Sequence, residues 1–230
     1  MDARQRYLNT RAELDRFCES VGRSSSDVTL VAVSKTVGLN EVASALQGGA
    51  LDFGENRPDE LVKKADAFKQ ARWHFIGNIQ SRRIKDIVGR ATLIHSLFDL
   101  SHARKIDECA KRIGIVQDVL IEVNVSGEQS KSGIAPESAQ EFFTACCQLQ
   151  NVRVRGLMTM AAQGDLDEAR HTFAKLAHLK EELLDEIPDL PAQQFDQLSM
   201  GMSEDWREAV AEGATIVRIG RAIFSETFSS

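Results

Sequence analysis

The strongest indication of the fold is the run Val28-Thr29-Leu30-Val31-Ala32-Val33, which is followed by Ser34-Lys35-Thr36. It is short, continuous and rich in β-branched residues, which is typical of a strand buried on both faces. A polar break at 24–27 precedes it. A predicted helix over 39–47 follows it and ends at Gly48-Gly49, a common helix stop. A buried strand that leads directly into a helix indicates an α/β protein with a parallel sheet.

The same alternation continues to the end of the chain. Further strands are predicted over 51–53, 73–76, 92–95, 119–124, 152–158, 195–199 and 215–219. Further helices are predicted over 2–21, 57–70, 81–87, 100–113, 136–149, 164–186 and 204–212. Eight strands, each followed by a helix or turn, predict a (β/α)8 TIM barrel with an extra N-terminal helix, in one domain over 1–230. An open doubly wound sheet is the alternative, but no GxGxxG motif follows the first strand.

Composition narrows the class of protein. The 230 residues suit one α/β barrel, and the fractions of 43% hydrophobic and 27% charged residues are ordinary for a globular chain. A net charge of −6 argues against a general nucleic-acid binder. Residues 1–20 are too charged for a signal peptide, and no stretch approaches the ~18 apolar residues of a membrane span. The four cysteines lack CxxC spacing. These features predict a cytoplasmic protein that does not bind membranes.

Lys35 is the candidate reactive group, because a barrel places its active site at the carboxyl ends of its strands. Alternation puts Val31, Val33 and Lys35 on one face of the first strand, which we expect to point into the barrel. A lysine at the rim of an apolar barrel is partly desolvated, which favours the neutral amine. That amine attacks an aldehyde to form a Schiff base. The alternative is a lysine that ends the strand and reaches into water.

A phosphate pocket is predicted at the loops after the seventh and eighth strands, where barrels often bind phosphate near a helix N-terminus. The polar and small residues there are Ser199-Met200-Gly201-Met202-Ser203 and Arg218-Ile219-Gly220-Arg221. Serine supplies a hydroxyl, glycine exposes backbone N–H groups, and arginine binds phosphate through paired hydrogen bonds. The alternative is that Gly201 and Gly220 only form tight turns.

Two polar residues at other strands have two interpretations each. Asn56 follows the second strand, where it either lies against a bound ring or caps the following helix. His74 lies inside the third strand, and we interpret it as a hydrogen-bonded core histidine rather than a base.

Seven ordered segments carry a family resemblance. They are Leu30–Thr36, Phe53–Asn56, Trp73–Gly77 with Gln80, Ile121–Asn124 with Lys131–Gly133, Gly156–Thr159, Leu198–Ser203 and Val217–Gly220. Through them nearly the whole chain resembles the pyridoxal-phosphate homeostasis proteins, also called the YggS/PROSC family. The resemblance implies a barrel of the alanine racemase N-terminal domain type. It also implies pyridoxal 5′-phosphate (PLP) bound as a Schiff base to the lysine after the first strand, here Lys35.

The resemblance also assigns roles to the remaining site residues. It implies that Ser199, Met200 and Gly220 hold the phosphate and that Asn56 flanks the ring. Arg218 faces either the pyridine nitrogen or the phosphate, and we favour the nitrogen. An arginine there keeps that nitrogen unprotonated and weakens PLP as an electron sink. Arg221 departs from the threonine common at this position in the family, and it adds a candidate ion pair to the phosphate.

The implied function is PLP binding in intracellular vitamin B6 homeostasis, with PLP-dependent apo-enzymes as recipients and no robust catalysis. The alternatives are a small PLP-dependent amino-acid racemase or decarboxylase, and a lyase that uses Lys35 on a sugar phosphate without PLP. Racemization needs a second acid or base opposite the lysine. The one tyrosine, Tyr7, lies in the predicted N-terminal helix, and we expect no second domain. We expect a monomer, because no long apolar surface stripe calls for a partner.

Overall fold

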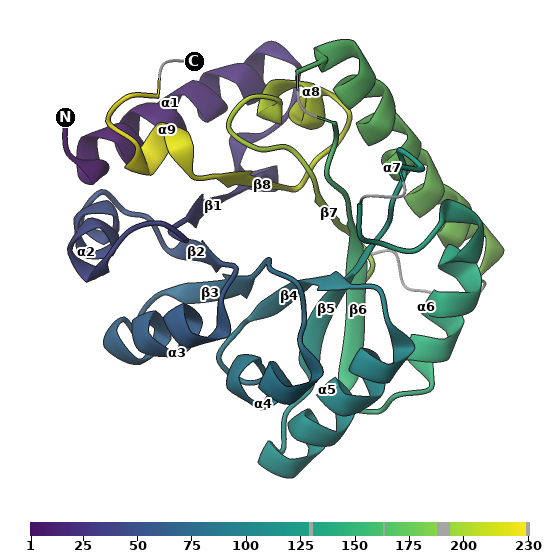
Figure 1. Ribbon diagram of the computed structural model, residues 1–230. Coiled ribbons are helices and arrows are strands. Elements are labelled where there is room, and N and C mark those ends of the chain that lie inside the picture. The colour runs from purple at the N-terminus through teal and green to yellow at the C-terminus, as the bar shows by residue number, and fades with distance from the viewer. Residues whose placement is uncertain (129–130, 163, 188–193, 229–230) are drawn as a thin grey trace.

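Parallel strands in chain order close into a barrel in the computed structural model, which describes residues 1–128, 131–162, 164–187 and 194–228. Each strand pairs with the next, and the last returns to the first (Figure 1). The strands are β1 Thr29–Val33, β2 Asp52–Glu55, β3 Arg72–Phe75, β4 Leu93–Leu97, β5 Gln117–Glu122, β6 Val152–Met158, β7 Gln197–Ser199 and β8 Ile216–Ile219. The predicted TIM barrel is confirmed, and the open sheet is excluded.

Helices form the outer ring of the barrel (Figure 1). They are α1 Ala3–Ser20, α2 Leu39–Gln47, α3 Pro58–Ala67, α4 Ile84–Ile87, α5 Leu100–Ile113, α6 Ala139–Cys147, α7 Leu166–Glu186, α8 Trp206–Ala211 and α9 Arg221–Phe224. The predicted extra N-terminal helix is α1, which packs against α2, α8 and α9. It occupies the ring beside β8 and β1, where α9 alone is only one turn long.

Some predicted helix boundaries were wrong. The helix predicted over 204–212 begins only at Trp206, with Asp205 at the N-cap position. The Asp205 carboxylate accepts a hydrogen bond from the backbone N–H of Met202 at 2.6 Å, which holds 202–205 in a turn instead. The helix predicted over 136–149 is divided into a 3₁₀ turn, Pro136–Ser138, and α6. Helix α9 was not predicted at all.

The inside of the barrel is partly apolar and partly polar. Its apolar cluster consists of Val31, Val33, Leu93, Leu120, Met158 and Ile216. The expectation that Val31 and Val33 point inward is therefore confirmed. The opposite faces of the strands, such as Leu30 and Ala32, join the larger core under the helices. Buried polar side chains from other strands share the interior, and they are described with the site.

Among the described residues, no helix combines the length and the apolar character that crossing a bilayer requires.

Candidate functional site

A cavity of about 500 Å³ opens at the carboxyl ends of the strands. We call it the upper cavity. Its lining residues are Val33, Lys35, Asn56, Ile76, Gly77, Asn78, Gln80, Met158, Met160, Met202, Ser203, Arg218, Gly220 and Arg221. Val33, Ile76 and Met158 also belong to the apolar interior of the barrel, so the floor is apolar and the polar groups surround it. A volume of this size lies within the usual range for small-molecule sites.

Lys35 lies two residues beyond the last residue of β1 and lines the upper cavity. Lys35 continues the inward alternation of Val31 and Val33 along the strand, and this explains why it lines the cavity. Its side chain is exposed, so the predicted partial desolvation was wrong. The two interpretations of this lysine prove compatible, because it both reaches water and borders the cavity.

Asn56 is held by close backbone packing rather than by capping a helix. Helix α3 has Arg57 at its N-cap position, so the capping interpretation of Asn56 is wrong. A Cβ atom at Gly77 would lie 2.1 Å from the carbonyl oxygen of Asn56. Only glycine allows the chain after β3 to approach this closely, and Asn56 and Gly77 both line the upper cavity.

Arg218 is the buried cation of the site. Nη1 donates to the Ser199 hydroxyl at 2.6 Å, and Nη2 donates to the carbonyl oxygen of Thr159 at 3.0 Å. Burial lowers the pKa of Arg218 to about 10, although the charges of Asp205 and Glu122 oppose the shift. The guanidinium therefore stays charged at neutral pH. These are its only two side-chain hydrogen bonds to the described residues, so its other N–H groups are available to a ligand.

Ser199 and Met200 do not line the upper cavity themselves, although the Ser199 hydroxyl contacts a residue that does. Both are fully buried. The Ser199 hydroxyl points into the barrel, where it contacts Arg218 and, at 2.8 Å, Nδ1 of His95. Met200 packs in the core under the helices. Of the seven site residues predicted from the sequence, the structure thus brings five together around the cavity: Lys35, Asn56, Arg218, Gly220 and Arg221.

Arg221 stands at the edge of the cavity with a carboxylate partner. Its Nη1 lies 2.8 Å from Oε1 of Glu204, and its guanidinium lies 5.2 Å from the ring centroid of Phe228. Both charged side chains of the pair are about half exposed, at 52% and 49%. An ion pair this exposed contributes little to stability, so Arg221 is free to exchange Glu204 for another anion.

A buried ionic cluster supports the two strand ends that carry Lys35 and Asn56. Lys64 of α3 is completely buried, and its Nζ donates to the carbonyl oxygen of Ser34 at 2.8 Å and to Glu55 Oε1 at 2.6 Å. Ser34 Oγ donates to the same carboxylate oxygen at 2.6 Å. Sequence reasoning missed this cluster, because Lys64 has the same i,i+4 spacing from Glu60 as an ordinary surface pair.

The interpretation of His74 as a core histidine is confirmed. The residue is 5% exposed, and its ring nitrogens lie 2.9 Å from His95 and 3.1 Å from Asp52. Asp52 and His95 were missed as parts of the site. The only signal for them was their period of two along the strands, which places them on the inward face.

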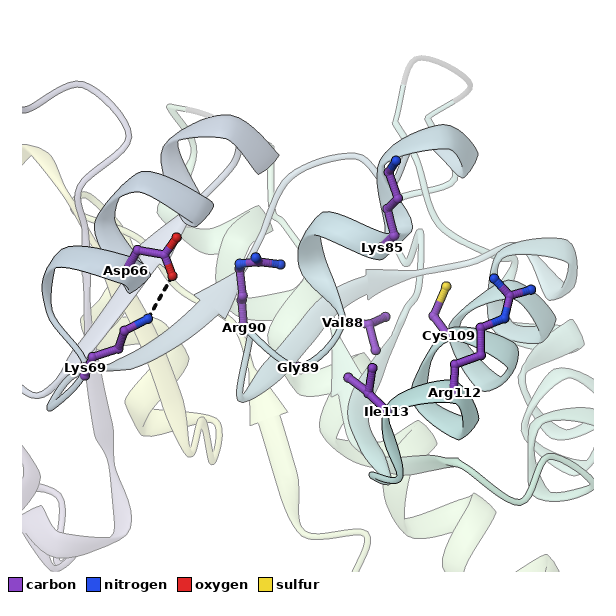
Figure 2. A pocket seen from close by; sticks show the side chains of 9 residues that line it. All are labelled: Asp66, Lys69, Lys85, Val88, Gly89, Arg90, Cys109, Arg112 and Ile113. Atoms are coloured by element: carbon purple, nitrogen blue, oxygen red, sulfur yellow. Dashed lines mark hydrogen bonds and ion pairs between the residues drawn. The ribbon is translucent and has the colours of Figure 1, made fainter.

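A separate basic pocket of about 440 Å³ lies at the opposite end of the barrel. Figure 2 shows the side chains that line it, which come from the C-terminal parts of α3 and α5, from α4, and from the loops after α3 and α4. Four are cationic and exposed: Lys69, Lys85, Arg90 and Arg112. Asp66 pairs with Lys69 at 2.8 Å. None of the predicted site residues contributes to this pocket.

Comparisons with known proteins place the whole chain in a family. The model of the alanine racemase N-terminal domain matches residues 11–227. A pyridoxal phosphate homeostasis protein of Aquifex aeolicus is 41% identical over 230 residues, which cover 98% of this chain and 99% of that protein. Its Pseudomonas aeruginosa counterpart is 42% identical over 216 residues, covering 93% and 90%. The chain belongs to the pyridoxal phosphate homeostasis protein family.

A solved structure supports the same relationship. PipY of Synechococcus elongatus, determined with PLP bound, is 30% identical to this chain and has a TM-score of 0.80. The match covers 92% of this chain and 99% of PipY. The family resemblance and the alanine racemase type of barrel, both expected from the sequence, are therefore confirmed.

Proposed function

We propose that this chain binds PLP in the upper cavity as a Schiff base on Lys35 and acts in intracellular PLP homeostasis. The observation that carries the proposal is the placement of Lys35 and Arg218 on the wall of one cavity. The binding of PLP by the relative PipY supports it. PLP supplies an aldehyde, and the Lys35 amine condenses with that aldehyde with loss of one water to form a C=N bond.

The other lining residues suit the remaining parts of PLP. Arg221 and the backbone around Gly220 offer a cation and donors for the phosphate, as arginine does in paired contacts. Asn56 offers an amide to flank the ring. Arg218 offers unpaired N–H groups to the pyridine nitrogen. We assign Ser199 and Met200 to the support of this pocket, where Ser199 orients Arg218 by a hydrogen bond.

We further propose carriage rather than robust catalysis as the role of this single domain. Tyr7, the only tyrosine of the chain, lies on the cavity at the other end of the barrel, with Asp52 and Arg72. Burial raises the pKa of Tyr7, so its hydroxyl stays protonated at neutral pH. This arrangement disfavours a racemase that needs a second group opposite Lys35. We propose a cytoplasmic monomer that delivers PLP to apo-enzymes and binds neither nucleic acid nor membranes.

The test is a reduction experiment on the purified protein incubated with PLP. We expect borohydride to fix one PLP, and peptide mapping by mass spectrometry to place it on Lys35. Lys35→Ala is expected to abolish the adduct while thermal unfolding stays close to wild type. Lys85→Ala, at an exposed lysine of the basic pocket, is the matched control and is expected to keep the full yield.

Two results would overturn the proposal. A normal adduct yield in Lys35→Ala would show that another lysine carries PLP. Rapid loss of optical activity or release of carbon dioxide with a panel of amino acids would replace the carrier by a racemase or decarboxylase. Replacing Arg221 by Met tests the phosphate assignment: we expect weaker binding of PLP and unchanged binding of pyridoxal, which lacks the phosphate.

A further inference from the structure

A continuous series of buried hydrogen bonds, which we call the relay, connects the upper cavity with the opposite end of the barrel. It begins at Arg218, which lines the upper cavity, and passes to Ser199 of β7 at 2.6 Å and to His95 of β4 at 2.8 Å. It continues to His74 of β3 at 2.9 Å and ends on Asp52 of β2 at 3.1 Å.

The far end of this chain is anchored by a second arginine. Arg72 donates through Nε and Nη2 to the two carboxylate oxygens of Asp52, at 2.7 Å and 2.5 Å. Asp52 and Arg72 line a lower cavity of about 540 Å³, to which Tyr7, Arg11 and Asp15 also contribute. The chain of contacts therefore crosses the whole interior from one cavity to the other.

The Ser199 end of the chain allows one proton arrangement. A guanidinium only donates, so the Ser199 oxygen accepts from Arg218. The hydroxyl proton then needs an acceptor, and Nδ1 of His95 is the only other described partner of that oxygen. If His95 also donated to Ser199, this buried proton would have no acceptor, which is unfavourable. His95 therefore accepts at Nδ1 and carries its proton on Nε2.

The Asp52 end is consistent with the same arrangement. Burial raises the pKa of Asp52, but hydrogen bonds from Arg72 and His74 outweigh this and lower it to about 2. A carboxylate only accepts, so His74 donates from Nε2. Its Nδ1 is then free to accept from Nε2 of His95. Burial is the largest cause that holds the pKa of His95 well below its usual value, in agreement with a neutral ring.

We propose that Asp52, His74 and His95 are positioning residues of the site, which act through Ser199 to fix the Arg218 guanidinium at the upper cavity. Each donor in the chain points away from Arg218 and toward Asp52, so the positive and negative ends polarise the bonds between them. The relay fixes one orientation of the Ser199 hydroxyl and leaves the remaining Arg218 donors directed to the ligand. This inference rests on the proposed function for its ligand, but the proton arrangement does not depend on it.

The first test uses the protein without ligand. Long-range ¹H–¹⁵N correlation spectra report which ring nitrogen carries the proton in each histidine, with assignments from single His→Gln variants. We expect both His74 and His95 to be neutral and protonated on Nε2. A proton on Nδ1 of His95, or a doubly protonated His74, would overturn the proposal.

The second test perturbs the far end of the relay and includes a matched control. Asp52→Asn removes the terminal charge with almost no change of shape, and we expect His95 to acquire a population protonated on Nδ1. Arg153 makes a similar two-bond contact with Asp118, at 2.6 Å and 3.0 Å, outside the relay. Asp118→Asn is therefore expected to leave the histidine spectra unchanged. Equal spectra for wild type and Asp52→Asn, or equal changes in both variants, would refute the relay.

The third test measures the bound cofactor. In Asp52→Asn we expect a shifted absorption maximum of bound PLP and an affinity about tenfold weaker, as for loss of one charge-assisted hydrogen bond. Asp118→Asn is expected to stay within about twofold, since its contact is remote. A purely structural role for Asp52 would lower the melting temperature without moving the absorption maximum. If the wild type binds no PLP, the proposed function fails, while the spectra without ligand still decide the relay.

Discussion

The buried Lys64–Glu55 pair offers the sharpest test of how the barrel supports its site. The two charged groups are 2.6 Å apart, and both side chains are completely buried. Lys64→Met keeps most of the side-chain volume but removes the cation. The Glu55 carboxylate is then left in the core with the Ser34 hydroxyl as its remaining described hydrogen-bond donor. Its other oxygen already has no described partner.

The expected loss of stability in Lys64→Met follows from the free energy needed to keep an unpaired charge buried. Breaking a buried ion pair by removing one partner costs about 3–5 kcal/mol. For a domain in this size class, each kcal/mol lowers the melting temperature by about 2–4 °C. We therefore expect Lys64→Met to melt roughly 6–20 °C below wild type. The same variant should form the Lys35 adduct more slowly, because Lys64 also holds the carbonyl of Ser34, next to Lys35.

The assays are thermal unfolding and urea unfolding, both followed by circular dichroism, with the neighbouring residue as control. Lys63 precedes Lys64 in α3 and has a side chain that is 55% exposed, so Lys63→Met should change the unfolding free energy by less than about 0.5 kcal/mol. The double variant Lys64→Met with Glu55→Gln should be more stable than the sum of the two single changes in unfolding free energy predicts, because no unpaired carboxylate charge remains in the core. If Lys64→Met were as stable as Lys63→Met, the reasoning would be refuted.

Two further predictions concern Gly77 and Asp52. Gly77→Ala should lower the free energy of unfolding by about 1–3 kcal/mol and weaken PLP binding, because the new Cβ atom would lie 2.1 Å from the carbonyl oxygen of Asn56. Denaturant unfolding measures the change in stability. The control is Gly38→Ala, where the nearest atom is the flexible end of the Glu41 side chain at 3.3 Å. Asp52 has its pKa lowered from 3.8 to about 2, so its contribution to stability is complete above about pH 4 and is lost as the pH falls toward 2. Asp52→Asn should therefore be less stable at neutral pH and show a flatter stability profile between those pH values; an acid-unfolding profile parallel to wild type would contradict this.

Sequence periodicity was sufficient for the architecture and for part of the site. Short β-branched runs alternating with amphipathic helices gave the barrel, because the two periods of 2 and 3.6 differ clearly. The inward alternation of Val31 and Val33 led to Lys35, since residues after a strand in a barrel gather at one end. The ordered motifs then identified the family, which the comparisons confirmed.

The contacts between side chains inside the barrel could not be predicted from the sequence. Asp52, His74 and His95 come from three strands, and their contacts depend on strand register, such as the pairing of Asp52 with Arg72 and of Gly54 with His74. The sequence fixes the face on which a side chain lies, but not its height against the next strand. The inward direction of the Ser199 hydroxyl and the burial of Lys64 could not be predicted from the sequence either, because both depend on partners that are distant in the chain.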